Sequence, residues 1–259
     1  MQNTDHNENM KNIILKRTTI ESKKEPPYDD IENTRSGNIW KNIPGGHKWL
    51  DYFKIYDKEF SRFVNTKPRV LEIGVYRGAS LRLWKNFFGE GSFILGIDLN
   101  EQCLKHQSPD ENIFVEIGDQ SNQDFLKDII NRYGPFDIII DDGSHMASHQ
   151  IISFMSLFYE GLKVGGIYLV EDLECMYWGS TNTYRDLPST SVDFFKKLID
   201  FQNEVFSRYS CNDLSINSED FKNQVDVINI SKFLYSVTFY QGVVAIEKEE
   251  KNPPRVLHI

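Results

Sequence analysis

Five short apolar runs, most of them separated by helix-like segments, constrain the fold of this 259-residue chain most strongly. Each run is nearly continuous in Val, Ile, Leu or Phe, which is typical of a strand that is buried on both faces of a parallel sheet. Strands that alternate with helical segments predict a sheet covered by helices on both sides. The five runs are residues 69–73, 93–97, 113–117, 136–140 and 166–170.

Two further apolar segments close the sheet near the end of the chain. Residues 233–240 and 243–247 are separated only by Gln241 and Gly242, and so short a connection makes two strands an antiparallel hairpin. We therefore predict an α/β fold, doubly wound and Rossmann-like, whose mostly parallel seven-stranded sheet ends in a C-terminal antiparallel hairpin. The main helices are expected at residues 81–88, 125–133, 150–162 and 191–208.

Residues 1–34 differ in composition from the rest of the chain. They are rich in Asn, Lys, Glu and Asp, so they cannot bury enough apolar surface to offset the entropy lost on ordering. We expect a flexible arm, or alternatively a segment that docks on a partner subunit, followed by one domain over residues 35–259. Aromatic residues spaced three and four apart predict an amphipathic helix after Gly45–Gly46.

The balance of charge excludes several kinds of partner. The chain has 29 basic and 38 acidic side chains, a formal charge of −9, which argues against a protein that follows nucleic-acid phosphates or adheres to anionic lipid. No apolar run reaches the roughly 18 residues that a membrane span requires. The three cysteines are widely spaced and suit a reducing compartment. We expect a soluble, cytoplasmic protein with no nucleic-acid or membrane partner.

The turn after the first strand has the pattern ExGxxxG, which begins at Glu72 and includes Gly74 and Gly78. The GxGxxG and GxxxxGK[ST] loops that bind pyrophosphate or nucleoside triphosphate are absent. Glycines let the backbone approach a ligand, the acid can hold a cationic or hydroxylated group, and a helix that begins near Ser80 would point free N–H groups at a carboxylate. An ordinary strand–helix turn is the alternative.

The next two turns also carry acids at strand ends, where ligands bind in doubly wound sheets. Asp98 follows the second strand 24 residues after Gly74, a position at which an acid commonly binds the ribose hydroxyls. Asp119 and Gln120 follow the third strand, at the height of a nucleobase. Either acid alone could cap a helix, but the three turns together fit S-adenosylmethionine, a nucleoside that has a carboxylate and an amine but no phosphate.

Four carboxylates and an imidazole follow the fourth and fifth strands. Asp141, Asp142 and His145 come after the fourth, and Glu171 and Asp172 after the fifth. Unpaired carboxylates this close would repel one another and raise their own pKa values. A hard divalent cation relieves that repulsion, and oxygen ligands suit Mg²⁺ rather than zinc. We predict an Mg²⁺ site with His145 as a base beside it.

The two histidines that follow the fourth strand have alternative roles. His145 could cap a helix or make a structural hydrogen bond. With His149 it forms an HxxxH pair, which can bind zinc on a helix, but the glutamate of the HExxH motif is missing. We therefore expect His149 to be a packing residue.

At these residues the sequence resembles the class I S-adenosylmethionine-dependent O-methyltransferases. Within them it is most similar to the metal-dependent group that methylates sugars in antibiotic biosynthesis, of the mycinamicin and novobiocin type. The similar stretches span about residues 69–174, and the closing hairpin agrees as well. They are VLEIGVYRGASLRLW, GIDLN, EIGDQSN, FDIIIDDGSHMASHQ and GGIYLVEDLE.

The resemblance implies a role for each of these residues. Residues of the first turn would hold the methionine part of S-adenosylmethionine, Asp98 its ribose, and the third turn its adenine, while Asp141 would face the cofactor amine or orient Asp142. His145 would be the catalytic base. The residues implied for the methionine part are Glu72, Gly74, Tyr76 and Ser80, those for adenine are Asp119 and Gln120, and those for Mg²⁺ are Asp142, Glu171 and Asp172.

The function expected from this resemblance is Mg²⁺-dependent transfer of a methyl group to a sugar hydroxyl of a glycosylated natural product or saccharide. Two alternatives stay open: a cephalosporin hydroxylase-like protein with a similar acidic cluster, and a non-catalytic cofactor-binding module. A nucleotide-linked or capsular sugar is an alternative acceptor. Residues 175–185 are a candidate lid, because aromatic faces such as Tyr177, Trp178 and Tyr184 suit sugar rings. The family and the arm suggest a homo-oligomer.

Overall fold

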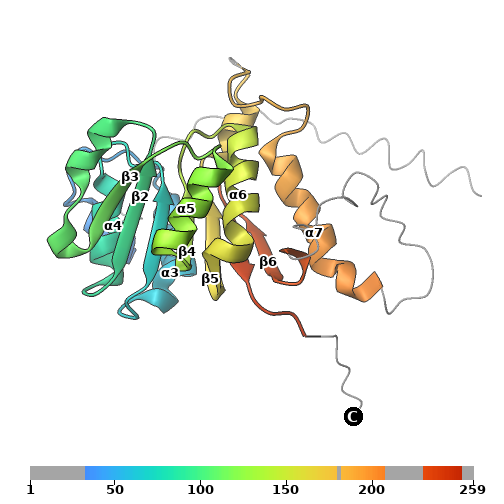
Figure 1. Ribbon diagram of the computed structural model, residues 1–259, viewed down its shortest axis with the longest axis horizontal. Helices are drawn as coiled ribbons and strands as arrows, with labels where there is room; N and C mark the ends of the chain where they lie inside the picture. Colours follow the sequence, from blue (N-terminus) through green and yellow to red (C-terminus); the bar gives the residue numbers. More distant parts are fainter. Residues whose placement is uncertain (1–32, 180–181, 208–229, 253–259) are drawn as a thin grey trace, which may run out of the picture.

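The computed structural model describes residues 33–179, 182–207 and 230–252. Their seven strands form one sheet in the order β3-β2-β1-β4-β5-β7-β6, with β3 and β2 at one side of the view in Figure 1 and β6 at the other. β1 to β5 pair in parallel, whereas β7 is antiparallel to both β5 and β6. The predicted fold, including the C-terminal hairpin, is therefore confirmed. The strands are β1 (Arg69–Ile73), β2 (Phe93–Asp98), β3 (Ile113–Ile117), β4 (Phe136–Asp141), β5 (Leu162–Val170), β6 (Leu234–Phe239) and β7 (Val244–Lys248).

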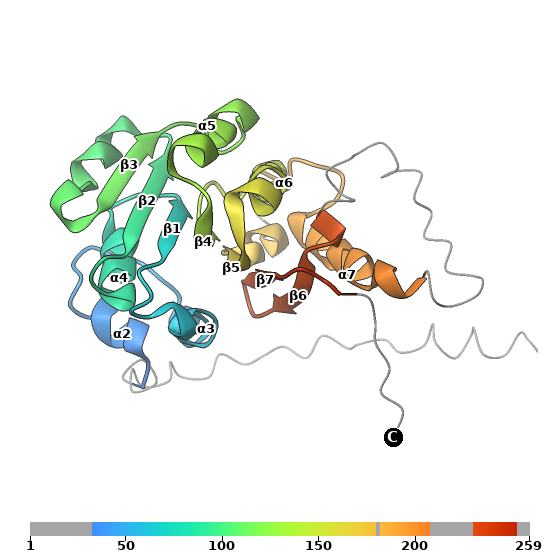
Figure 2. The same ribbon diagram turned by 60° about the horizontal axis from the view of Figure 1, so that its bottom comes forward.

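Helices cover both faces of this sheet, as the near-continuous apolar strands predict. Alternate residues of β1 illustrate the two layers, because Leu71 packs into one core cluster and Val70 into the other. Figure 2 shows α3 and α4 on one side of the sheet and α5 and α6 on the other. The first layer contains α3 (Tyr52–Phe60) and α4 (Ala79–Phe88), and the second contains α5 (Gln123–Tyr133), α6 (Ala147–Gly161) and α7 (Ser191–Ser207).

The helix predicted after Gly45–Gly46 is α3, but the aromatic residues before it do not extend it. Trp40 ends a separate short helix, α2 (Arg35–Trp40), and Trp49 lies in the connecting segment. Within α3, Tyr56 and Phe60 are completely buried and their rings stack on one another. The aromatic spacing thus predicts the buried face of α3, whereas residues 41–51 form a loop that reaches the sheet.

The predicted arm, residues 1–34, lies almost entirely outside the described residues and stays a prediction. No helix within the described ranges is long and apolar enough to cross a membrane.

The parallel strands bring their carboxyl ends to one edge of the sheet. In register, Ile73 of β1 lies beside both Ile97 of β2 and Asp141 of β4, and Asp141 lies beside Val170 of β5. The turns that follow these strands therefore meet at this edge, although they come from distant parts of the sequence.

Candidate functional site

A cavity of about 350 Å³ opens at this edge, between the turns that follow β1, β2, β3 and β4. Its wall is mostly apolar, with a smaller number of polar side chains and main-chain groups, a composition typical of sites for small molecules and cofactors. Six of the residues predicted from the sequence line it: Gly74, Tyr76, Asp98, Asp119, Gln120 and Asp142.

Asp98 holds the first turn in place. Its Oδ2 accepts the backbone N–H groups of Val75 at 2.8 Å and Tyr76 at 3.0 Å, and its Oδ1 accepts that of Asn100. Burial works to raise the pKa of Asp98, but these N–H groups favour its charged form and the net shift is downward. Asp98 is therefore a fixed negative charge at the cavity wall.

Gly74 is required where the turn after β1 passes close to the turn after β4. Its φ is +95°, and a Cβ at this position would come within 2.1 Å of the backbone oxygen of Asp142. Only glycine tolerates both the left-handed conformation and this approach. The sequence predicts that this glycine lets the backbone approach a ligand, which stays a prediction; the close approach that the structure shows is to the backbone of Asp142.

Glu72 and Ser80 come together, but neither lines the cavity. Glu72 is completely buried, where its carboxylate accepts hydrogen bonds from Ser80 Oγ at 2.7 Å and Trp84 Nε1 at 2.9 Å. Burial raises the pKa of Glu72 to about 7. In this structure the pair anchors the start of α4 to β1, below the cavity floor.

Asp141 also lies behind the cavity wall. It is completely buried, and burial raises its pKa to about 6 although a hydrogen bond from Gln120 Nε2, at 3.1 Å, favours the charged form. The amide oxygen of Gln120 accepts the backbone N–H of Ser144 at 2.7 Å. Asp141 thus orients Gln120, which lines the cavity and ties the third turn to the fourth.

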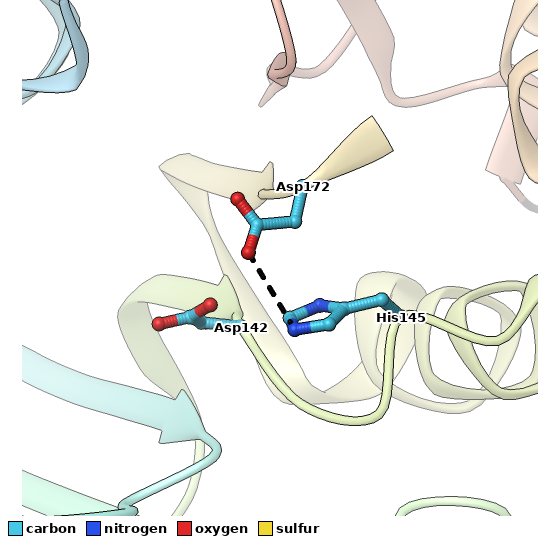
Figure 3. A group of neighbouring side chains, drawn as sticks. All are labelled: Asp142, His145 and Asp172. Carbon is cyan, nitrogen blue, oxygen red and sulfur yellow. Dashed lines mark ion pairs between the residues drawn. The ribbon is translucent and has the colours of Figure 1, made fainter. Parts of the chain in front are cut away.

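Three candidate metal ligands meet at the border of this cavity. One ligand atom each from Asp142, His145 and Asp172 lies within 4.8 Å of the others. In Figure 3 the imidazole of His145 points toward the carboxylate of Asp172, and Asp142 lies beside them. His145 Nε2 is 3.5 Å from Asp172 Oδ2, while its Nδ1 is buried and meets no partner among the described residues. Two carboxylates and an imidazole fit a divalent cation, and the oxygen ligands favour Mg²⁺.

Glu171, the third predicted metal ligand, is held by a residue that the sequence patterns do not single out. Lys48 Nζ lies 2.5 Å from Glu171 Oε2 and 2.5 Å from Asp142 Oδ2. Burial works to lower the pKa of Lys48, but the two carboxylates raise it well above its usual value. Lys48 therefore carries a positive charge between two of the predicted ligands.

Two tyrosines of α3 complete this arrangement. Tyr56 donates to Glu171 Oε1 at 2.8 Å, and Tyr52 donates to Asp172 Oδ1 at 2.9 Å. The three-and-four spacing of the aromatic residues predicts that this face is buried, but it does not reveal that the hydroxyl groups reach the strand ends. Lys48 lies in a polar Gly-Gly-His-Lys stretch that gives no signal of burial.

The zinc alternative has no support in this geometry. His149 Nδ1 lies 2.9 Å from Ser144 Oγ, and its side chain lines the cavity. The group of possible metal ligands found within the described ranges contains His145 but not His149.

Part of the candidate lid lies beside His145. The rings of Tyr184 and His145 are 6.4 Å apart, and Trp178 meets Tyr184 edge to face at 5.6 Å. Tyr177 is 66% exposed. Aromatic surface is therefore present next to the candidate metal group.

Comparison with known proteins identifies relatives of the domain. No family model matches the chain. The chain is 37% identical over 194 residues to 8-demethyl-8-α-L-rhamnosyl tetracenomycin-C 2'-O-methyltransferase of Streptomyces olivaceus. The aligned region covers 68% of this chain and 50% of that protein. It is also 41% identical over 155 residues to mycinamicin VI 2''-O-methyltransferase of Micromonospora griseorubida, and this alignment covers 56% of this chain and 38% of that protein.

Among solved structures, MycE methyltransferase of the mycinamycin pathway, in complex with Mg, SAH and mycinamycin VI, matches with a TM-score of 0.65. The identity is 29%, over 85% of this chain and 54% of that one. The chain is a homologue of the sugar O-methyltransferases. Its domain has their class I methyltransferase fold, although it spans half or less of the length of these two curated relatives.

Proposed function

We propose that the chain is an S-adenosylmethionine- and Mg²⁺-dependent O-methyltransferase that modifies a sugar hydroxyl of a glycosylated natural product. Asp142 carries this proposal, because its side chain belongs both to the cavity wall and to the candidate metal group. A methyl donor in the cavity and an acceptor beside the metal group would therefore be neighbours. The homologues support the reaction type, since their names describe O-methyltransferases that act on rhamnosyl and olivosyl compounds.

The cavity would hold the cofactor through the residues that line it. Asp98 presents a fixed carboxylate for the ribose hydroxyls, and Asp119 and Gln120 would flank the adenine. Gly74 and Tyr76 would border the methionine part. Glu72 and Ser80 would act there only indirectly, since they fix the start of α4, and Asp141 would act through Gln120.

The metal group would hold Mg²⁺ through Asp142 and Asp172, with Glu171 as a further ligand once its oxygen is released from Lys48. When bound, Mg²⁺ lowers the pKa of a coordinated hydroxyl. His145 Nε2 would accept the proton of the acceptor hydroxyl as a general base, because it lies within 4.8 Å of the carboxylate oxygens that would hold the metal. Asp172 Oδ2, 3.5 Å away, would stabilise the resulting imidazolium, and the fixed geometry would align the hydroxyl oxygen with the methyl donor.

The remaining expectations are part of the same proposal. A flexible arm over residues 1–34 would precede one catalytic domain over residues 35–259. The enzyme would act in the cytoplasm as a homo-oligomer, on a small sugar-containing acceptor and not on nucleic acid. The net charge of −9 supports the last point, because a nucleic-acid enzyme needs a basic surface.

The test is methyl transfer with purified full-length chain, labelled S-adenosylmethionine and Mg²⁺. Acceptors would be mycinamicin VI, a rhamnosylated polyketide and a nucleotide-linked sugar, with products analysed by mass spectrometry. We expect one added methyl group on a glycoside, loss of activity in EDTA, and recovery when Mg²⁺ is returned. The Asp142→Asn variant serves as the inactive control. A hydroxylated product, or cofactor binding without methylation of any acceptor, would contradict the proposal.

A further inference from the structure

A second cavity lies on the far side of Tyr52 from the candidate metal group. Its volume is about 130 Å³. It is bordered by the loop before α3, the segment after β5 and the turn of the C-terminal hairpin. The lining residues are Trp49, Asp51, Tyr52, Glu174, Gln241 and Gly242.

One hydroxyl group separates this cavity from the metal group. The Tyr52 oxygen lies 2.9 Å from Asp172 Oδ1 and 3.2 Å from Glu174 Oε2. A molecule that fills the cavity would therefore touch Tyr52 on one side, while Asp172 occupies the other. This is the position expected for the part of an acceptor that adjoins its reacting hydroxyl.

The wall of the cavity offers hydrogen-bond acceptors and an aromatic face. Glu174 lies in this wall with its Oε2 accepting from the Tyr52 hydroxyl and its Oε1 buried, and the Trp49 side chain also acts as a hydrogen-bond donor to this carboxylate. Asp51 precedes α3 but its side chain does not cap the helix. Trp49 is 52% exposed, so an aromatic face is available to the ligand.

Gly242 keeps the wall open. Its φ is +76°, and a Cβ there would lie 2.5 Å from the Tyr52 oxygen and 2.7 Å from Glu174 Oε2. Any larger residue would push these two oxygen atoms apart and occupy the space beside them.

We propose that this cavity is a saccharide subsite for a neutral or amine-bearing sugar ring, and that it rejects rings with a phosphate or carboxylate. A sugar ring has an apolar face for Trp49 and hydroxyl groups that would donate to Glu174 and Asp51. An anionic group would meet two carboxylates, and the described lining contains no basic side chain. The subsite deepens the proposed function, on which it rests, because it disfavours nucleotide-linked sugars as acceptors.

Direct binding tests the subsite without the reaction. Saturation-transfer NMR would measure the binding of methyl α-L-rhamnoside, methyl glucosaminide and methyl glucuronide to the full-length chain with Mg²⁺ but without cofactor. We expect the glucuronide to bind at least about tenfold more weakly than the rhamnoside. Trp49→Ala and Glu174→Gln should each weaken rhamnoside binding about tenfold. The matched controls, Tyr235→Ala and Glu90→Gln, change exposed residues outside this cavity and should leave binding unchanged.

The subsite is overturned if the rhamnoside binds both Trp49→Ala and Glu174→Gln as tightly as wild type, or if the glucuronide binds as well as the rhamnoside. The proposed function fails separately. Rhamnoside binding that depends on Trp49 and Glu174, with no methyl transfer to any glycoside, would retain the subsite and reject the methyltransferase activity. Methyl transfer to a glycoside, with an acceptor KM that is unchanged in Trp49→Ala and Glu174→Gln, would retain the methyltransferase activity and reject the subsite.

Discussion

Acidic side chains occupy both halves of the carboxyl edge of the sheet, but they are held in different ways. At the β1–β3 edge, formed by Glu72, Asp98, Asp119 and their turns, the partners are backbone N–H groups, hydroxyls and an indole within 23 residues. At the β4–β5 edge, formed by Asp142, His145, Glu171 and Asp172, they include Lys48, Tyr52 and Tyr56, which lie 94 to 123 residues away in sequence.

The difference separates two kinds of electrostatic stabilisation. Neutral donors hold each acid of the β1–β3 edge individually, so that one side chain can change without leaving a charge unpaired elsewhere. The β4–β5 edge concentrates three carboxylates around one ammonium and one imidazole, so that each charge depends on its neighbours. We therefore expect changes at the β4–β5 edge to affect catalysis and folding strongly, and changes at the β1–β3 edge to affect ligand binding and pH dependence.

The largest contrast should appear in turnover. Replacing His145 by alanine removes the proposed base, and we expect kcat to fall about 10²–10⁴-fold while affinity for S-adenosylhomocysteine is retained. Asp119→Asn, at the other edge, should raise the cofactor KM roughly tenfold and leave kcat nearly unchanged. Steady-state kinetics with calorimetric binding would measure both. Near-full turnover in His145→Ala would show that the base is another group.

The next effect concerns folding. Lys48→Met leaves Asp142 and Glu171 without their buried cation, and in EDTA we expect the free energy of unfolding to fall by about 3–5 kcal/mol. Mg²⁺ should restore part of this loss, because it supplies positive charge to the same carboxylates. Lys196→Met is the matched control: the Lys196 side chain is 57% exposed and its Nζ lies 3.5 Å from Asp193 Oδ1, so this substitution should cost at most about 1 kcal/mol. Urea unfolding would measure both losses. Equal losses would show that the contacts of Lys48 with Asp142 and Glu171 add no more stability than an exposed ion pair.

Among the described residues, the buried carboxylate of Glu72 accepts hydrogen bonds only from the neutral groups of Ser80 and Trp84, and it should make the stability of the fold depend on pH. Burial raises the pKa of Glu72 to about 7 from an ordinary value of 4.5. The folded chain therefore binds the proton more tightly than the unfolded chain, and stability is lost as pH rises from about 4.5 through 7. Glu72→Gln removes this titration. In EDTA it should exceed wild type in stability by up to roughly 3 kcal/mol at pH 8 and match it near pH 4. A parallel pH dependence in variant and wild type would rule out Glu72 as its source.

Replacing Asp98 should give the smallest change in stability, and its dependence on pH should be opposite in sign to that of Glu72. Its pKa is lowered, despite burial, by backbone N–H groups, so its stabilising contribution is present above its unfolded pKa and is lost as pH falls. Asp98→Asn should therefore cost about 1.5 kcal/mol at pH 7 and less near pH 3, which lies below the ordinary pKa of 3.8. Thermal unfolding at the two pH values would detect it. A loss of equal size at both would mean that the amide, and not the charge, is responsible.

The sequence predicts the partners of the acids better at the β1–β3 edge than at the β4–β5 edge, because at the β1–β3 edge they lie nearby in sequence. Strand runs, the hairpin and the turn acids depend on neighbours in sequence, and the structure confirms the fold and brings Asp98, Asp119 and Gln120 to one cavity. Even the burial of Glu72 has a local signal, because Ser80 and Trp84 are four residues apart on one face of α4. The position of Lys48 depends on how a loop folds across the sheet, and no local pattern encodes it.

The backbone of the site has a further consequence for how this chain can change. Six non-glycine residues of the described ranges have positive φ, and three of them, Tyr76, His145 and Asp172, are predicted site residues. Glycine would adopt each of these backbone conformations at a lower cost, by an amount on the order of 1 kcal/mol. At Tyr76, whose side chain is 68% exposed, selection for stability alone should therefore favour glycine. At His145 and Asp172 the backbone cost is set against contacts that glycine would lose, namely the His145–Asp172 pair and the hydrogen bond from Tyr52.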